Sequence, residues 1–369
     1  MAQEGRLRSL DVFRGLTIAG MIVVNTPGNE SPYAPLEHAD WHGCTPTDLV
    51  FPFFLFIVGT AIVFALARRK DEGGPRRELI LGILRRTAVL FGLGLFLNAI
   101  PNYHPSSIRL PGVLQRIALC YLAGSLVFLW TGLRAQVALA AALLAGYWLL
   151  MTRVPVPGFG PGDLGKEGNL AACIDRLVFG PHTYRHGVFD PEGLLSTMGA
   201  VATTLLGIFA GLWLKAARPP RDKAAGLVIA GTAAAVAGGL WALWFPLNKA
   251  LWTSSYVLYT GGLAAFTLAA CYWLVDMKGR AGWALPFEAL GVNAITAYVL
   301  PILLLKALVL TKVAGPAGAP IQLRIWLCDR LFGSWLAPAN ASLAFSLAYL
   351  SGWTVVFREL HRRKVVFKV

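Results

Sequence analysis

Charged residues are scarce in this chain. Only 14% of its 369 residues are Asp, Glu, Lys or Arg, whereas a soluble domain has about 25%. Hydrophobic residues make up 56%, which is more than the cores of two soluble domains would hold. Disorder is excluded too, because disordered chains are poor in aromatic residues and this one has 12 Trp, 20 Phe and 10 Tyr. The composition favours a protein that crosses a membrane several times.

Acidic residues are the rarer of the two charges. The chain has 19 Asp and Glu against 33 Lys and Arg, which gives a formal net charge of +14. Such an excess also occurs in nucleic-acid-binding proteins, but these carry it on a polar, water-facing surface. Here the basic residues flank apolar stretches. We therefore expect membrane lipids, and no nucleic acid, as partners.

Cysteine is rare as well. The five cysteines are scattered without a CxxC spacing, so they indicate neither a zinc site nor a disulfide framework. His38 and His42 are four residues apart, but no HExxH or similar pattern supplies further ligands, and we predict no metal site. A cleavable signal peptide is not expected, because Asp11 and Arg14 interrupt the first apolar stretch.

Ten apolar stretches could each cross a membrane, which takes roughly 20 mostly apolar residues per helix. They lie at 10–26, 48–67, 79–99, 112–131, 134–151, 193–214, 224–245, 250–275, 284–308 and 340–358. We predict an all-α, polytopic transmembrane helix bundle of about ten spans, formed by a single domain over residues 1–369. The loops 152–192 and 309–339 are long enough for structure of their own. In the second loop, Leu323, Trp326, Leu327 and Leu331 at helical spacing predict a helix that lies in the membrane interface or packs on the bundle.

The distribution of basic residues predicts the topology, since Lys and Arg are retained on the cytoplasmic side. With the N-terminus inside and ten alternating spans, the inner segments hold 22 of the 33 Lys and Arg. Net charge is then +13 inside and +1 outside. We expect both termini to be cytoplasmic and the loop between the first two spans to lie outside.

Polar residues near these spans are candidates for function. Asp11, Arg14 and Asn25 share one face of the first helix; Asp11 and Arg14 are expected to pair, while Asn25 either joins helices or takes part in chemistry. Asp48 has a structural explanation, because Thr45-Pro46-Thr47-Asp48 matches a helix start with a capping box. His38 has none. It is either a general base or acid or an ordinary exposed loop histidine.

Later segments place further polar residues at the ends of apolar spans. Arg116 and Lys249 could hold an anionic substrate group or extend to lipid headgroups. Asp190 and Glu192 could be an N-cap and a first-turn acid. The full set of candidates for substrate binding is Trp41, Gln115, Arg116, Asp190, Glu192, Asn248, Lys249, Trp252 and Asn293.

Two segments, 10-LDVFRGLTIAGMIVVN-25 and 38-HADWHGCTPTDLVFPFFLFIVG-59, resemble the catalytic region of the heparan-α-glucosaminide N-acetyltransferase family. DPEGLLST, PLNKALWTSS and GVNAITAY follow in the family's order, so the resemblance covers most of the chain. It implies a multi-span enzyme, with its catalytic motifs in 10–67, that moves an acetyl group from cytosolic acetyl-CoA to an amino sugar on the far side. It also implies that homodimers can form.

The same resemblance implies roles for individual residues. His38 corresponds to the family's catalytic histidine and Asn25 to the asparagine near it. Asp48 is expected to orient the His38 imidazole, and Asn25 to stabilise the oxyanion. His42 stands where the lysosomal enzyme has Asn, so we do not expect it to be essential.

Coenzyme A is highly anionic, and Arg14, Arg85 and Arg86 at inner span ends are the candidates for binding its nucleotide. The sequence leaves open whether His38 is acetylated or acts only as a base. It also leaves two rival functions open: a sugar or lipid transporter or flippase, and an O-acyltransferase that acts on a cell-wall or lipid-linked glycan. For a bacterial chain, the expected location is the inner (plasma) membrane.

Overall fold

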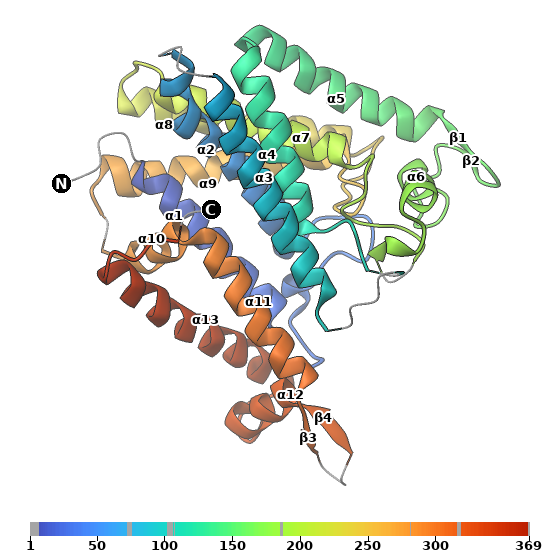
Figure 1. Ribbon diagram of the computed structural model, residues 1–369, viewed down its shortest axis with the longest axis vertical. Helices are drawn as coiled ribbons and strands as arrows, with labels where there is room; N and C mark the ends of the chain where they lie inside the picture. Colours follow the sequence, from blue (N-terminus) through green and yellow to red (C-terminus); the bar gives the residue numbers. More distant parts are fainter. Residues whose placement is uncertain are drawn as a thin grey trace. The chain divides into compact units, whose positions relative to one another are not determined.

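The computed structural model describes residues 7–71, 76–101, 106, 108–184, 187–280, 282–315 and 319–367 (Figure 1). Helices dominate these residues, and the strands among them form only two short antiparallel hairpins, β1–β2 and β3–β4. The all-α prediction is therefore confirmed.

The helices and strands are labelled in chain order. The α-helices are α1 (Arg8–Asn25), α2 (Val50–Asp71), α3 (Arg76–Ala99), α4 (Val113–Trp130), α5 (Leu133–Arg153), α6 (Leu170–Phe179), α7 (Thr197–Lys215), α8 (Pro220–Trp241), α9 (Ser254–Cys271), α10 (Leu285–Val292), α11 (Ala294–Leu310), α12 (Leu323–Cys328) and α13 (Pro338–Arg362). The strands are β1 (Pro155–Val156), β2 (Gly160–Pro161), β3 (Lys312–Ala314) and β4 (Pro320–Gln322). The short 3₁₀ helices are η1 (Ala34–Leu36), η2 (Pro46–Leu49) and η3 (Gly180–His182), and the π-helical segments are η5 (Tyr272–Met277) and η7 (Asp329–Gly333).

All ten predicted spans coincide with helices. Within the described residues, eight helices are long and apolar enough to cross a membrane, and α10 and α11 would add a ninth as one span bent by 89° at Asn293. A multi-pass helical membrane protein is thus confirmed. The expected tenth span is α1, which has the length but carries Arg8, Asp11 and Arg14 among its 18 residues. Because of these three charges, α1 is less apolar than the eight helices that could cross a membrane.

The described chain divides into two compact units. The larger unit comprises Asp40–Cys44 and Phe51–Trp273, and the smaller comprises Leu7–Ala39, Thr45–Val50 and the chain from Leu274 onward. The segment after α1 therefore contributes residues to both units.

The larger unit holds α2 to α9, and glycines set how closely its helices pack. A Cβ atom at Gly59 of α2 would lie 1.9 Å from the carbonyl oxygen of Thr204, and one at Gly207 of α7 would lie 2.0 Å from that of Phe56. The two backbones therefore touch where α2 and α7 cross, as small residues permit in membrane helices. The Thr60 hydroxyl also donates to the Gly207 carbonyl across this crossing, over 3.0 Å.

The smaller unit is built on a similar close contact between α1 and α10. A Cβ at Gly15 would lie 1.7 Å from the Phe287 carbonyl oxygen, and one at Gly291 would lie 1.9 Å from that of Asp11. Arg14 Nη1 donates to Asp11 Oδ1 over 3.0 Å and to the Gly291 carbonyl over 3.1 Å, which confirms the predicted pair.

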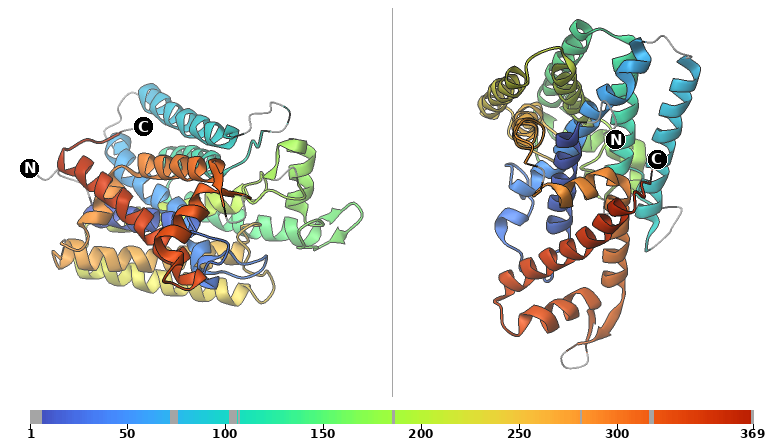
Figure 2. Two further views of the ribbon diagram at one scale, coloured as in Figure 1. Left: turned by 90° about the horizontal axis from the view of Figure 1, so that it is seen from below. Right: turned by 90° about the vertical axis from the view of Figure 1, so that its left-hand side faces the viewer.

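The expected helix within 309–339 is also present in the smaller unit. There α11 leads through β3 and β4 into α12, whose first turn begins at Leu323 (Figures 1 and 2). Cys328, Ala341 and Phe345 form a buried cluster between this region and α13. The segment thus packs on α13, which is the second of the two arrangements expected for it.

Candidate active site

His38 and Asp48 form a close pair in the smaller unit. His38 Nδ1 lies 2.7 Å from Asp48 Oδ1. The His38 side chain is 51% exposed, whereas that of Asp48 is 1% exposed. A solvent-accessible imidazole therefore contacts a buried carboxylate. This geometry is the one expected if Asp48 orients His38.

A capping box fixes Asp48. Its Oδ2 accepts hydrogen bonds from the Thr45 amide (3.0 Å), the Thr45 hydroxyl (3.1 Å) and the Ala39 amide (3.1 Å). Pro46 opens η2, which continues into α2, so the predicted helix start is confirmed. The cap uses Oδ2 and the histidine uses Oδ1. One side chain therefore serves the fold and the imidazole at once.

This geometry selects one imidazole tautomer. A carboxylate oxygen at Nδ1 favours the proton on that nitrogen, and the lone pair then resides on Nε2. A histidine held in this way can accept a proton at Nε2 while the carboxylate stabilises the resulting imidazolium. The pair has the parts of a general base.

Asn25 is the last residue of α1, in the same unit, and it is exposed. Across the residues that the structure describes, its side-chain amide makes no hydrogen bond. The amide is thus available to a ligand, although no hydrogen bond joins it to His38.

Trp41 and His42 belong to the larger unit. The Trp41 indole N–H donates to the Leu164 carbonyl over 2.8 Å. The Trp41 ring centroid lies 4.9 Å from that of Phe189 and 5.7 Å from Lys166 Nζ.

His42 contacts the buried Asn248, whose Nδ2 atom lies 3.3 Å from His42 Nδ1. Asn248 Oδ1 accepts a hydrogen bond from the Leu251 amide. Partial burial lowers the pKa of His42. The sequence indicated no role for His42, yet in the structure the Asn248 side-chain amide nitrogen contacts the His42 imidazole.

Arg116, Gln115 and Trp252 lie inside the larger unit rather than at its surface. Arg116 is 1% exposed, so the alternative that it extends to headgroups is wrong; Nη2 donates to the Gly193 carbonyl over 2.9 Å. Its Nε and Nη1 atoms, and Nε2 of buried Gln115, lack hydrogen-bond partners among the described residues. Trp252 is fully buried 5.2 Å from the Arg116 guanidinium, with φ at +53°, a left-handed conformation that non-glycine residues rarely adopt.

Asp190 and Glu192 bind Arg109, a residue that sequence reasoning missed. Arg109 Nε donates to Asp190 Oδ2 over 2.9 Å, and Nη2 contacts both carboxylates. Burial alone would lower the pKa of Arg109, but Glu192 and Asp190 together raise it above its ordinary value. The N-cap alternative is wrong, because the following helix begins only at Thr197. The three residues form an ionic cluster in which Asp190 is buried and Arg109 is partly exposed.

Asp175 of α6 is a second missed residue. Its Oδ1 accepts from the Leu194 amide over 2.8 Å, while Arg116 donates to the carbonyl of the same Gly193–Leu194 peptide. A Cβ on Gly193 would lie 1.8 Å from Asp175 Oδ2, so a larger residue at this motif position would displace that carboxylate. Burial raises the pKa of Asp175 to about 6.

The remaining candidates occupy separate places. In the smaller unit, Asn293 Nδ2 donates to the Val365 carbonyl and Oδ1 accepts from the Phe367 amide, so its amide holds the C-terminal segment. Lys249 is half-buried in the larger unit. Arg85 of α3 is exposed, whereas the Arg86 guanidinium lies 4.9 Å from the Tyr121 ring with its Nε unpartnered in the described chain. Arg14 already binds Asp11 and Gly291.

Residues 6–164, which include His38, Asp48 and Asn25, match the family described as heparan-alpha-glucosaminide N-acetyltransferase, catalytic. The family resemblance is confirmed. The chain is 33% identical over 355 residues to the mouse (Mus musculus) heparan-alpha-glucosaminide N-acetyltransferase, covering 81% of this chain and 53% of that protein. The corresponding values for the human (Homo sapiens) protein are 33% over 357 residues, with 80% and 52% covered. The chain thus spans about half the length of these relatives.

Proposed function

We propose that this chain is a transmembrane acetyltransferase that moves an acetyl group from cytosolic acetyl-CoA to the amino group of a glucosamine-type sugar on the outer side. The observation that carries the proposal is the His38–Asp48 pair at 2.7 Å within the region that matches the family. The relatives are named as N-acetyltransferases of a glucosaminide, which supports the reaction class.

The chemistry follows from the state of the amine. An ammonium group has no lone pair, so the sugar amine attacks in its neutral form, after its extra proton has passed to solvent. A base then takes one proton from the nitrogen as the C–N bond forms. His38 Nε2 is that base, and Asp48 stabilises the imidazolium. The C–S bond breaks, and the proton passes from His38 to the departing thiolate, which leaves as coenzyme A. The exposed Asn25 amide donates to the carbonyl oxygen as negative charge develops there, a contribution of roughly 2.7–4 kcal/mol in comparable sites.

Acetyl-CoA requires cations for its phosphates. Arg86 fits this need, because its Nε is buried and unpartnered among the described atoms, and Arg85 beside it is exposed. Arg14 fits poorly, since Asp11 and the Gly291 carbonyl already occupy its guanidinium. We assign the nucleotide to Arg85 and Arg86.

We assign the acceptor to Trp41 and His42, which follow His38 by three and four residues in the chain, and to Asn248, which contacts His42. The Trp41 ring offers a face for a sugar, as aromatic rings commonly do. Asn248 Nδ2 donating to Nδ1 of His42 leaves Nε2–H as a donor. The lowered pKa of His42 keeps it neutral, so it does not repel an incoming ammonium group.

The deciding experiment uses purified protein in lipid nanodiscs with radiolabelled acetyl-CoA and glucosamine. His38→Ala should lower N-acetylglucosamine formation by about 10²–10⁴-fold, the usual contribution of a general base. Thr45→Ala, which removes a hydroxyl that donates to Asp48 Oδ2 and to the Glu37 carbonyl but leaves the His38–Asp48 contact, is the folding control. Unchanged acetylation in His38→Ala would overturn the assignment. Alkali-labile product would indicate O-acylation, and sugar flux without acetylation would indicate transport.

The two chemical routes differ in one measurable respect. If His38 carries the acetyl group, the wild-type protein should exchange label between acetyl-CoA and coenzyme A without sugar. A direct transfer in a ternary complex gives no such exchange. Asn25→Ala should slow either route, because both pass through an oxyanion.

A further inference from the structure

An apolar cavity of about 540 Å³ opens in the larger unit. Residues of α2, α7, α8 and α9 line it, among them Phe56, Leu206, Phe209, Trp213 and Ala230. Trp213 carries the one polar side-chain group of the lining, and its indole N–H already donates to the Lys223 carbonyl over 3.0 Å. The cavity therefore offers a ligand apolar surface and no unsatisfied side-chain partner.

The closely packed helices α8 and α9 form one side of the cavity. A Cβ at Gly231 of α8 would lie 2.8 Å from the Gly262 carbonyl of α9, and one at Gly238 would lie 2.4 Å from the Tyr259 amide nitrogen. These glycines hold α8 against α9, and Figure 2 shows the two helices running side by side. The cavity lies between this helix pair and α7, beside the place where Trp213 of α7 packs against Gly226 of α8.

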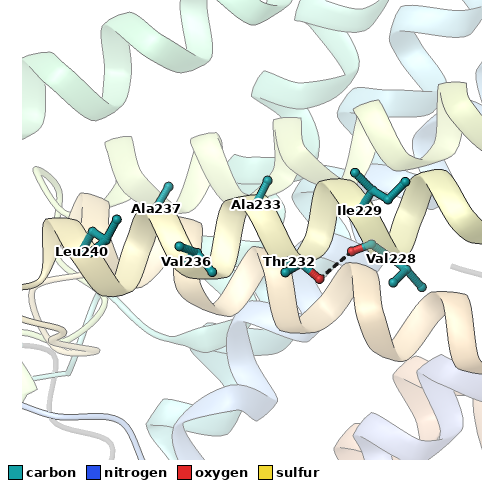
Figure 3. Close-up of a pocket in the computed structure, with 7 residues that line it drawn as sticks. All are labelled: Val228, Ile229, Thr232, Ala233, Val236, Ala237 and Leu240. Atoms are coloured by element: carbon teal, nitrogen blue, oxygen red, sulfur yellow. Dashed lines mark hydrogen bonds between the residues drawn. The ribbon is translucent and has the colours of Figure 1, made fainter.

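The cavity continues onto the outer surface of α8. Ile229 lines the cavity and also belongs to an exposed apolar row, in which the Thr232 hydroxyl is satisfied by the Val228 carbonyl at 2.9 Å (Figure 3). An apolar row of this kind on a membrane-spanning helix contacts lipid. An acyl chain can therefore pass from the bilayer into the cavity.

Cations stand at one end of the cavity. The Arg218 guanidinium lies 4.3 Å from the centroid of the Trp213 ring that lines it. The connection from α7 to α8 and the helix ends that flank it, residues 215–223 (the 215–223 loop below), hold Lys215, Arg218, Arg221 and Lys223 against Asp222 alone, a net charge of +3. Apolar walls that end at a basic loop match a molecule with a long hydrocarbon chain and an anionic head.

We propose that this cavity is a binding site for an anionic phospholipid, with one acyl chain in the cavity and the phosphate beside Arg218. Coenzyme A is the competing anion, but the amides of its pantetheine arm would lose their hydrogen bonds to water against these walls. Such a lipid would hold α7 and α8 together at the membrane surface that the 215–223 loop faces. The site is independent of the acetyl-transfer chemistry proposed above.

Native mass spectrometry of the whole protein tests this, after reconstitution with equal phosphatidylglycerol and phosphatidylcholine. The wild type should retain phosphatidylglycerol selectively. Ala230→Phe places a ring in the cavity and should weaken lipid retention by about tenfold. That factor corresponds to two methylene groups of the acyl chain that the ring keeps from being buried. Ala237→Phe places the same ring on the exposed row of Figure 3, outside the cavity, and should retain lipid as the wild type does.

A charge variant tests the headgroup contact. Arg218→Ala should weaken phosphatidylglycerol retention by about fivefold, the value of one basic residue near an anionic lipid, and leave phosphatidylcholine unaffected. Arg153→Ala, at the far end of α5, removes an exposed arginine as the control. Equal retention of both lipids by the wild type, equal effects of Ala230→Phe and Ala237→Phe, or displacement of the lipid by acetyl-CoA would each overturn the proposal.

Discussion

Asp48 combines two roles that substitution can separate. Asp48→Asn retains an oxygen for the cap but presents an amide N–H to His38 Nδ1, which favours the tautomer with its proton on Nε2. We expect kcat for glucosamine acetylation to fall by about 10²–10⁴-fold. Thr45→Ala should leave kcat near the wild-type value while it costs about 0.5–2 kcal/mol of stability through the lost cap. Similar kcat values for the two variants would contradict the assigned positioning role.

Asp175 should give the protein a pH-dependent stability. Its folded pKa of about 6 is above the ordinary value of 3.8 because burial penalises the charged form. Between these values the folded state binds more protons than the unfolded state, so stability should fall as pH rises from 4 to 7. The difference amounts to at most about 3 kcal/mol, at 1.36 kcal/mol per pKa unit.

The measurement is the thermal unfolding temperature in detergent from pH 4 to pH 7. Asp175→Asn keeps the acceptor for the Leu194 amide but cannot ionise, so its unfolding temperature should vary less over this range. It should also exceed that of the wild type at pH 7. Parallel pH curves for the two proteins would rule out this source of pH dependence.

Local sequence predicted the capping box that fixes Asp48, whereas the role of His38 beside it was expected from the family resemblance. The capping box spans Thr45 to Asp48, and His38 is ten residues from Asp48. Arg109 and Asp190 are 81 residues apart, so no local spacing indicates their contact. The sequence indicates only that Asp190 and Glu192 need a cation, and it does not specify which of the Lys and Arg residues supplies it.

At the level of helices, two glycine substitutions should act with opposite sign. Gly59→Ala would place a Cβ 1.9 Å from the Thr204 carbonyl oxygen and force α2 away from α7, which should cost about 1–3 kcal/mol or more. A Cβ at Gly92 of α3 would have no heavy atom within 4 Å. Gly92→Ala should therefore stabilise the protein by about 0.4–1 kcal/mol, because alanine lowers the conformational entropy of the unfolded chain. Unfolding temperatures of both variants check this, and equal shifts would refute the backbone contact.

The apolar stretches located the membrane-spanning helices well but not their irregularities. The predicted span 284–308 contains the 89° bend at Asn293, which separates α10 from α11. The Asn293 side chain there binds the backbone of the C-terminal segment. That bend depends on residues more than 70 positions away. Likewise α1 matches a predicted span in length, and only its three charges, satisfied by partners such as Glu288 and Gly291, distinguish it.

At the scale of the whole molecule, the charge asymmetry of the sequence remains the basis for orientation. The 215–223 loop, with its net charge of +3, should face the cytoplasm, and the loop with Lys166 between α5 and α6 should face outward. Both Lys166 and Arg221 are exposed, so single cysteines at these positions would be accessible on whichever side they occupy. The five native cysteines would first be replaced by alanine or serine.

In intact cells, a membrane-impermeant maleimide should label Lys166→Cys, while Arg221→Cys should react only after the membrane is permeabilised. This outcome would place the anionic lipid site at the cytoplasmic surface. Labelling of Arg221→Cys in intact cells would invert the topology and with it the proposed direction of transfer. The His38–Asp48 pair would then share a side with acetyl-CoA, and no acetyl group would need to cross the membrane.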